Sequence, residues 1–177
     1  MFKSFTMRFI KNLFPTTGFG LIVALMPVYA VAQTSIRPVR QFTSAQIDSA
    51  SSSKKTPDKP GRLLATGPSD ERYLIVVRTG EGAVEAHEQY DDVAVVRAGR
   101  GVLRTGPKVE GAKVSGTAPT REWLGGNIPK AAERRIAAGD FLVIPAGLPH
   151  QYVPDTGDSL VYFTIKVRQA DTPGLKK

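Results

Sequence analysis

The sequence predicts an all-β domain, a sandwich or a single antiparallel β-barrel, preceded by a short helical and linker segment. Short runs rich in β-branched and aromatic residues recur along the chain, and turns containing Gly, Pro and Asp separate them. The 177 residues include no Cys, which excludes a disulfide scaffold, a thiolate zinc site and a cysteine nucleophile. Stability must therefore come from core packing, which a chain of this length can supply.

The first segment, residues 1–32, has the layout of a secretory signal peptide. It starts with positive charges, continues into the short apolar run 19–28 and ends in small residues at 30 and 32. The alternative is an uncleaved membrane anchor, but the apolar run is shorter than the roughly 20 residues that a spanning helix needs. We therefore expect cleavage before Gln33, a periplasmic or secreted protein, and no stable membrane anchor after cleavage.

Residues 33–70 are expected to form a linker and N-terminal segment. They are polar and rich in Ser and Pro, with one short helix predicted from Thr43 as its N-cap through Ala50. Residues 71–168 form the predicted barrel, and residues 169–177 a C-terminal tail.

Within the barrel, six segments combine β-branched and aromatic residues with Gly- or Pro-containing boundaries. They are residues 73–77, 93–96, 102–105, 141–144, 151–153 and 159–167. Residues 106–135 are rich in Gly and Lys and weakly patterned. We expect them to form a long excursion anchored by Trp123.

The net charge of +8 gives little indication of a partner. Removing residues 1–32 takes away three positive charges and leaves +5, with acidic and basic residues interleaved. The sequence has no basic stripe with interspersed aromatic residues, so nucleic-acid binding is not expected.

The most informative motif begins at Gly139 and ends at His150, with the spacing G-x5-P-x-G-x2-H. It resembles the second motif of the cupin superfamily, although the family's following Asn is Pro154 here. The first cupin motif, G-x5-H-x-H-x4-E-x6-G, aligns less completely. Its second His falls on His87 and its closing Gly on Gly99, and the remaining positions differ. Where the family motif has its opening Gly, its first His and its Glu, this sequence has Thr79, Glu85 and Asp92.

The residues around His87 also resemble small exported bacterial cupins, the type called the cupin 2 conserved barrel. The resemblance covers residues 71–168 and implies a jelly-roll barrel with a site inside its open end. It also implies oxygenase, isomerase or lyase activity and pairing of two copies through sheet edges, that is, a homodimer.

The residues themselves support a site in such a barrel. Alternate residues of a strand share a face, so Glu85 and His87 should point the same way. Glu88 is a rival ligand to Glu85, although alternation turns it to the opposite face from His87. His150 opens a later strand, which antiparallel pairing can bring beside His87. Two imidazoles with carboxylates are ligands for Fe, Mn, Ni or Zn as divalent ions. We therefore predict a metal site formed by Glu85, His87, Asp92 and His150.

Two functions remain open at this point. The first is an exported metal-dependent protein that acts on a small molecule. The second is a non-catalytic module that binds a small, sugar-like ligand without metal. In a metal-free pocket His87 and His150 could also act as general acid and base. Tyr152 could be a proton donor there, or simply a packed aromatic residue.

Overall fold

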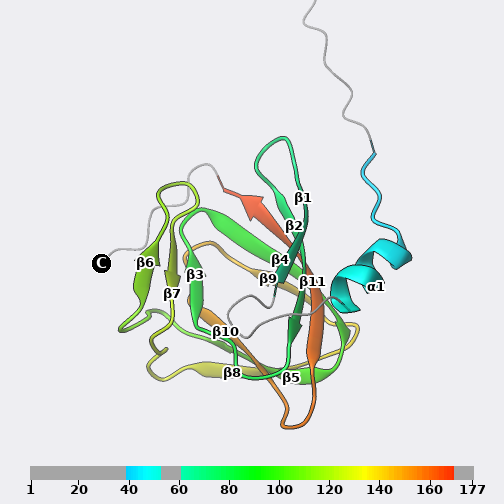
Figure 1. Cartoon of the computed structure of the whole chain (residues 1–177). Coiled ribbons are helices and arrows are strands. Elements are labelled where there is room, and N and C mark those ends of the chain that lie inside the picture. The colour runs from blue at the N-terminus through cyan, green and yellow to red at the C-terminus, as the bar shows by residue number, and fades with distance from the viewer. Residues whose placement is uncertain (1–38, 53–60, 170–177) are drawn as a thin grey trace, which may run out of the picture. The chain divides into compact units, whose positions relative to one another are not determined.

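The computed structural model describes residues 39–52 and 61–169 (Figure 1). The signal peptide predicted at residues 1–32 lies outside the described residues, and so does nearly all of the predicted tail. All described elements belong to one unit, Arg40–Lys177. In chain order they are α1 (Ser44–Ser52), β1 (Gly61–Thr66), β2 (Arg72–Arg78), β3 (Glu85–His87), β4 (Tyr90–Ala98), β5 (Arg100–Thr105), β6 (Lys113–Ser115), β7 (Glu122–Leu124), β8 (Ala132–Ala137), β9 (Phe141–Ile144), β10 (His150–Pro154) and β11 (Leu160–Arg168).

The strands form two antiparallel sheets that face each other (Figure 1). One sheet has the order β1-β2-β11-β4-β9, and the other has the order β6-β7-β3-β10-β5-β8. Because consecutive strands repeatedly pass from one sheet to the other, the chain closes into a jelly-roll barrel. The predicted all-β fold class is confirmed.

Each of the six predicted strands is present, as β2, β4, β5, β9, β10 and β11. The predicted helix is confirmed as α1. The Gln46 amide donates to Thr43 Oγ1 at 3.2 Å, and the Thr43 amide donates to Gln46 Oε1 at 2.8 Å. This reciprocal pair is a capping box, which satisfies two of the amides that a helix start leaves unpaired. Within the described residues, no helix is long and apolar enough to cross a membrane.

The expectation for residues 106–135 was wrong, because this stretch contains β6, β7 and most of β8. β7 pairs with β3, and β8 pairs with β5 along its whole length. Only Ile136 is buried in β8, so the strand lacks the alternation that would identify it from the sequence. β1 also extends the sheet before residue 71, and none of its residues is fully buried. Strands held mainly by backbone pairing at a sheet edge leave little trace in the side-chain pattern.

The apolar core lies between the two sheets. Tyr152 of one sheet stacks on Tyr162 of the other with ring centroids 4.3 Å apart and an interplanar angle of 18°. Around them pack Val76, Ala94, Val96, Leu103, Ile136, Ile144 and Leu160. This core fixes the separation of the sheets and so positions the polar residues described below.

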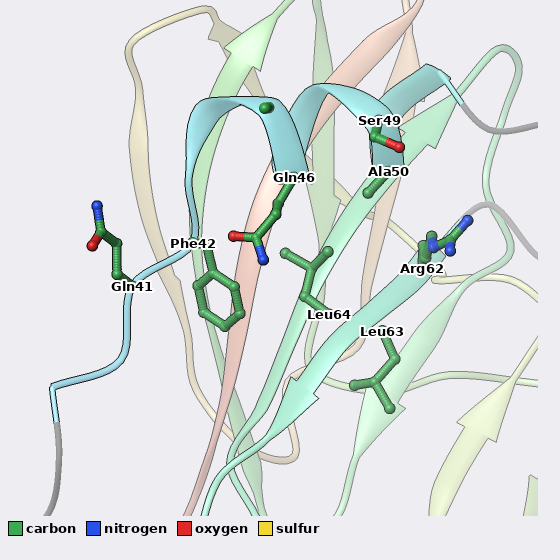
Figure 2. Close-up of a pocket in the computed structure, with 9 residues that line it drawn as sticks. Gln41, Phe42, Gln46, Ser49, Ala50, Arg62, Leu63 and Leu64 are labelled. Carbon is green, nitrogen blue, oxygen red and sulfur yellow. The ribbon is translucent and has the colours of Figure 1, made fainter.

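The segment containing α1 covers part of the outer face of the five-stranded sheet. The Phe42 ring lies 5.3 Å from Tyr73 and 6.0 Å from Phe163, measured between centroids. A pocket of about 490 Å³ lies between α1 and β1, and Figure 2 shows the residues that line it. Among the described lining residues the only charged one is Arg62, and none of them carries a carboxylate or imidazole group that could hold a metal.

Candidate metal centre

A group of buried polar side chains lies between the sheets beside the apolar core. The six-stranded sheet contributes Glu85 and His87 from β3 and His150 from β10. The five-stranded sheet contributes Asp92 from β4 and Lys166 from β11, which are cross-strand partners. Four of these residues are at most 8 % exposed, and Glu85 is partly buried. The structure thus brings together all four residues that the sequence predicted, with a lysine among them.

The position of His150 follows from the turn that precedes it. The Gly147 amide donates to the His87 carbonyl oxygen at 2.8 Å, which ties this turn to β3. Gly147 has a φ of +79°, a conformation that favours glycine. His150 is then directly opposite Glu85 in the β10–β3 ladder, so both side chains point to the same face.

The His150 ring is oriented so that its Nε2 lone pair faces the site. Its Nδ1 lies 3.0 Å from the Leu148 carbonyl oxygen, which can only accept, so Nδ1 donates and Nε2 is left unprotonated in the neutral ring. Nε2 is buried and has no hydrogen-bond partner among the described residues. An imidazole nitrogen held in this way is suited to binding a metal or accepting a proton.

His87 is oriented by a carboxylate that the sequence analysis did not identify. Glu122 is the cross-strand partner of His87 in the β3–β7 ladder, and its Oε2 lies 3.3 Å from His87 Nδ1. On the other side of the ring, His87 Nε2 lies 3.6 Å from Glu85 Oε2. A carboxylate behind a ligating imidazole is a frequent support of metal sites, because it fixes the ring and raises its basicity.

Glu85, His87 and His150 can together bind a metal ion. One ligand atom from each lies within 4.8 Å of the other two. Two atoms that each lie about 2.1 Å from a common metal are at most about 4.2 Å apart, so these three ligand atoms need to approach one another only slightly. The donor set and the unpartnered Nε2 of His150 therefore fit a divalent ion.

Glu85 is held in place by Arg78 at the end of β2, another residue missed in the sequence. Arg78 Nη2 forms an ion pair with Glu85 Oε1, and Arg78 Nε donates to the Tyr162 hydroxyl at 3.0 Å. Burial alone would raise the pKa of Glu85, but the charges of Arg78 and Lys166 outweigh burial and lower it. Glu85 is therefore an anion with one oxygen directed to the site.

Asp92 reaches the site but is already bound to Lys166. Its Oδ2 lies 3.5 Å from Nε2 of both histidines, while its two oxygens accept hydrogen bonds from Lys166 Nζ at 2.8 and 3.0 Å. Burial opposes ionisation of Asp92, yet the Lys166 ammonium and the imidazoles hold its pKa well below the ordinary value. Asp92 is thus a buried carboxylate neutralised by an internal cation.

Lys166 also contacts His87, with Nζ 2.6 Å from Nε2. A hydrogen bond between these two nitrogens requires one of them to accept with a lone pair. The Lys166 ammonium and a doubly protonated, cationic His87 therefore cannot both be present. Burial and Lys166 lower the pKa of His87, but Asp92 and Glu122 outweigh them and raise it. Of the two Nε2 atoms that face the site, that of His87 contacts the Lys166 ammonium. That of His150 has no hydrogen-bond partner among the described residues, with Asp92 Oδ2 3.5 Å away.

Glu88 faces away from the site, as strand alternation predicted. Its Oε1 accepts a hydrogen bond from Arg121 Nη1 at 2.8 Å. Tyr152, in contrast, lies beside the site with its ring edge toward His150, at a centroid distance of 6.1 Å. Its buried hydroxyl has no hydrogen-bond partner among the described residues. Burial, the largest cause, raises the pKa of Tyr152 well above the usual range, so the hydroxyl stays protonated and can donate a hydrogen bond.

Comparisons with known proteins agree with this fold. Residues 130–175, about a quarter of the chain, match the family model of the AraC-like ligand binding domain. This stretch includes β9 to β11 and therefore both His150 and Lys166. A search of curated protein sequences found no significant match to the chain.

Solved structures with similar folds come from several bacteria. Protein BH2720 from Bacillus halodurans is 18 % identical, with a TM-score of 0.52, over 76 % of this chain and 86 % of that one. An uncharacterized conserved protein with a double-stranded β-helix domain from Klebsiella pneumoniae is 12 % identical, with a TM-score of 0.50, over 75 % of this chain and 93 % of that one. These likenesses show that the chain has a double-stranded β-helix fold, the jelly-roll arrangement that the sequence motifs indicated.

Proposed function

We propose that this chain is an exported cupin that binds a divalent metal ion through Glu85, His87 and His150 and acts on a small molecule at that ion. Asp92 is the fourth donor in the proposal, and Fe, Mn, Ni and Zn are the metals that suit such ligands. A metal held there would act as a Lewis acid that polarises an oxygen of the bound molecule. The proposed activity is of the oxygenase, isomerase or lyase type.

One observation carries the metal proposal. His150 Nε2 is buried, faces the site and has no hydrogen-bond partner in the described part of the chain, although its ring is fixed by the bond from Nδ1 to the Leu148 carbonyl. A buried polar atom without a partner costs free energy, and proteins seldom keep one without a reason. Coordination of a metal would satisfy this atom and use the neighbouring carboxylate and imidazole at once.

The residues around the donors supply the rest of a small-molecule site. Arg78 and Glu122 fix the directions of Glu85 and His87, so that the donors are pre-positioned. The Tyr152 and Thr164 oxygens are buried and lack hydrogen-bond partners among the described residues. We infer that these two hydroxyls donate to oxygens of the bound molecule.

The test is metal binding by the metal-stripped protein, measured calorimetrically with Zn²⁺ and Mn²⁺. Glu85→Gln should weaken binding by at least roughly ten- to a hundredfold, the loss that removal of a residue supporting a ligand already causes. Glu88→Gln is the matched control, because Glu88 is the same residue type on the same segment but faces Arg121. His87→Ala combined with His150→Ala should abolish binding. Unchanged stoichiometric binding in that double variant would contradict the proposal.

A second function, binding of a small sugar-like ligand without metal, is favoured by Lys166. Its ammonium already supplies a cation at His87 and Asp92. The AraC-like family that matches residues 130–175 is described as ligand-binding. A ligand that binds equally well to the chelator-treated protein and after both histidine substitutions would support this function over the first.

Export and dimerisation complete the proposal. Export is supported by the composition of residues 1–32 and would be tested by the N-terminal sequence of the protein recovered from the periplasm or medium, expected to begin at Gln33. Dimerisation is supported by the unpaired edges of the two sheets, among them β9 with its exposed Phe141 and Val143. Sedimentation of the mature protein at low concentration should give a dimer, and a monomer would contradict this part.

A further inference from the structure

Lys166 is the one group in the candidate metal centre that a metal-binding site would not be expected to contain. It lies on β11 directly across from Asp92 on β4, and the residue is 8 % exposed. Nζ lies 2.6 Å from His87 Nε2 and 2.8 and 3.0 Å from the two oxygens of Asp92. Three donor atoms of the site therefore surround an ammonium group.

A metal ion and this ammonium cannot use His87 at the same time. A metal bound to an imidazole lies about 2.0–2.2 Å from the nitrogen, along the direction of its lone pair. Lys166 Nζ lies close to the same nitrogen, at 2.6 Å. Two cations so near each other would overlap sterically and repel electrostatically.

We propose that Lys166 is an internal cation that competes with the metal for His87 and Asp92. Metal binding requires the Lys166 ammonium to move away, and its departure releases Asp92 as the fourth ligand. This inference rests on the proposed metal function, since it concerns how the same donors are shared between two cations.

The charges around the site explain what the lysine contributes in the absence of metal. Glu85, Asp92 and Glu122 bring three carboxylates, of which Glu85 is paired with Arg78. Without Lys166, Asp92 would be a buried carboxylate with only imidazole neighbours, and such a charge is costly. Lys166 thus stabilises the metal-free barrel and by the same contact lowers the affinity for metal.

The experiment compares Zn²⁺ binding by the metal-stripped wild type, Lys166→Gln and Lys166→Arg. Gln removes the charge but keeps a hydrogen-bond donor, whereas Arg keeps the charge and is the matched control. Removing the competing charge should tighten Zn²⁺ binding at least roughly tenfold in Lys166→Gln. Lys166→Arg should bind no more tightly than the wild type. Adding Asp92→Asn to Lys166→Gln should reverse most of this gain in Zn²⁺ affinity, because the double variant lacks the Asp92 carboxylate that the loss of Lys166 frees to bind the metal.

A second measurement uses the wild type alone and does not depend on the folding of any variant. A buried, hydrogen-bonded Lys166 ammonium should give a protected ¹⁵Nζ signal in the NMR spectrum of the metal-free protein. Saturation with Zn²⁺ should remove or strongly shift this signal.

The outcomes separate this inference from the metal function itself. Tighter binding in Lys166→Gln together with loss of the ¹⁵Nζ signal supports both. Stoichiometric Zn²⁺ binding by the wild type with an unchanged ¹⁵Nζ signal, or with equal affinity in Lys166→Gln, overturns the competition and leaves the metal function standing. Absence of Zn²⁺ binding in both the wild type and Lys166→Gln overturns the metal function and the competition with it.

Discussion

The space between the two sheets has an apolar part and a polar part, built from the same strands. β4 contributes Ala94 and Val96 to the apolar core and Asp92 to the candidate metal centre. β11 likewise contributes Leu160 and Tyr162 to the core and Lys166 to the centre. Strand alternation thus places a stable core and a reactive site on one continuous inner face.

The two parts differ in how their residues depend on one another. Each apolar side chain contributes its own burial, and truncating one leaves the others apolar and in contact. The charged residues are buried only because each has a partner, so removing one leaves another buried without a partner. The polar part should therefore show large single-variant effects that are not additive, and the apolar part more nearly additive ones.

The largest expected effect comes from breaking the Asp92–Lys166 pair. Asp92→Asn leaves the Lys166 ammonium buried beside His87, and we expect a loss of about 3–5 kcal/mol in the free energy of unfolding. Urea denaturation of the metal-stripped protein measures it. The double variant Asp92→Asn/Lys166→Met replaces both charges and should recover most of that loss. If the double variant loses as much free energy of unfolding as the two single variants added together, Asp92 and Lys166 are not coupled.

A core truncation should cost somewhat less and leave the site intact. Leu160 is fully buried in the apolar core, and Leu160→Ala should lower the free energy of unfolding by about 3 kcal/mol through lost burial and the resulting cavity. Its Zn²⁺ affinity should equal that of the wild type. A reduction in affinity comparable to that of Glu85→Gln would show that the two parts are not separable.

Acid should weaken the polar part selectively. The pKa of Asp92 is held well below its ordinary value of 3.8, so the unfolded chain takes up this proton before the folded one. Stability contributed by Asp92 is therefore present above about pH 4 and lost as the pH falls further. In that range the proton that Asp92 binds in the unfolded chain but not in the folded one lowers the free energy of unfolding by about 1.4 kcal/mol for each unit that the pH falls. Urea denaturation at a series of pH values should show this slope reduced in Asp92→Asn/Lys166→Met and retained in Leu160→Ala.

The smallest expected effect lies outside both parts, at the start of α1. Thr43→Ala removes the side-chain half of the capping box and should lower the free energy of unfolding by about 1 kcal/mol or less. Thr43→Ser keeps the hydroxyl and is the control. Urea denaturation measures the loss, and a change in Zn²⁺ affinity in Thr43→Ala would contradict the separation of α1 from the site.

Much of the candidate site could be predicted because its residues lie where local patterns are informative. The Pro- and Gly-containing turn before His150 specifies the start of a strand. Alternation places Glu85 and His87 on one face and Glu88 on the other. These inferences need only neighbouring residues, and the structure brings the predicted side chains together.

Lys166 was missed because the outer face of β11 is more apolar than its inner face. Val161, Phe163 and Ile165 look like the inward face in the sequence, yet they lie on the outer face, where Phe42 packs on Phe163. The inward face is the other set, which runs from Leu160 to Lys166. The available signal was that Lys166 alternates in step with Leu160 and Tyr162. It would have predicted a buried lysine only if this face of β11 had been known to point inward.

Glu122 and Arg78 could not be found by local reasoning at all. Glu122 meets His87 because β7 pairs with β3 in one particular register across 35 residues of chain. Arg78 meets Glu85 because the chain crosses from one sheet to the other between β2 and β3, and both side chains lie between the sheets. Pairing registers of short strands are set by the whole barrel, so these two supports of the site follow from its topology.

The most direct test of the metal centre is anomalous X-ray diffraction from a crystal of the protein loaded with Zn²⁺. We expect one strong anomalous peak between the Glu85 carboxylate, His87 Nε2 and His150 Nε2, at about 2.0–2.2 Å from each ligand atom. Lys166 Nζ should no longer contact His87. A fully loaded protein whose anomalous peak lies elsewhere, or a crystal with no peak at saturating Zn²⁺, would contradict the assignment.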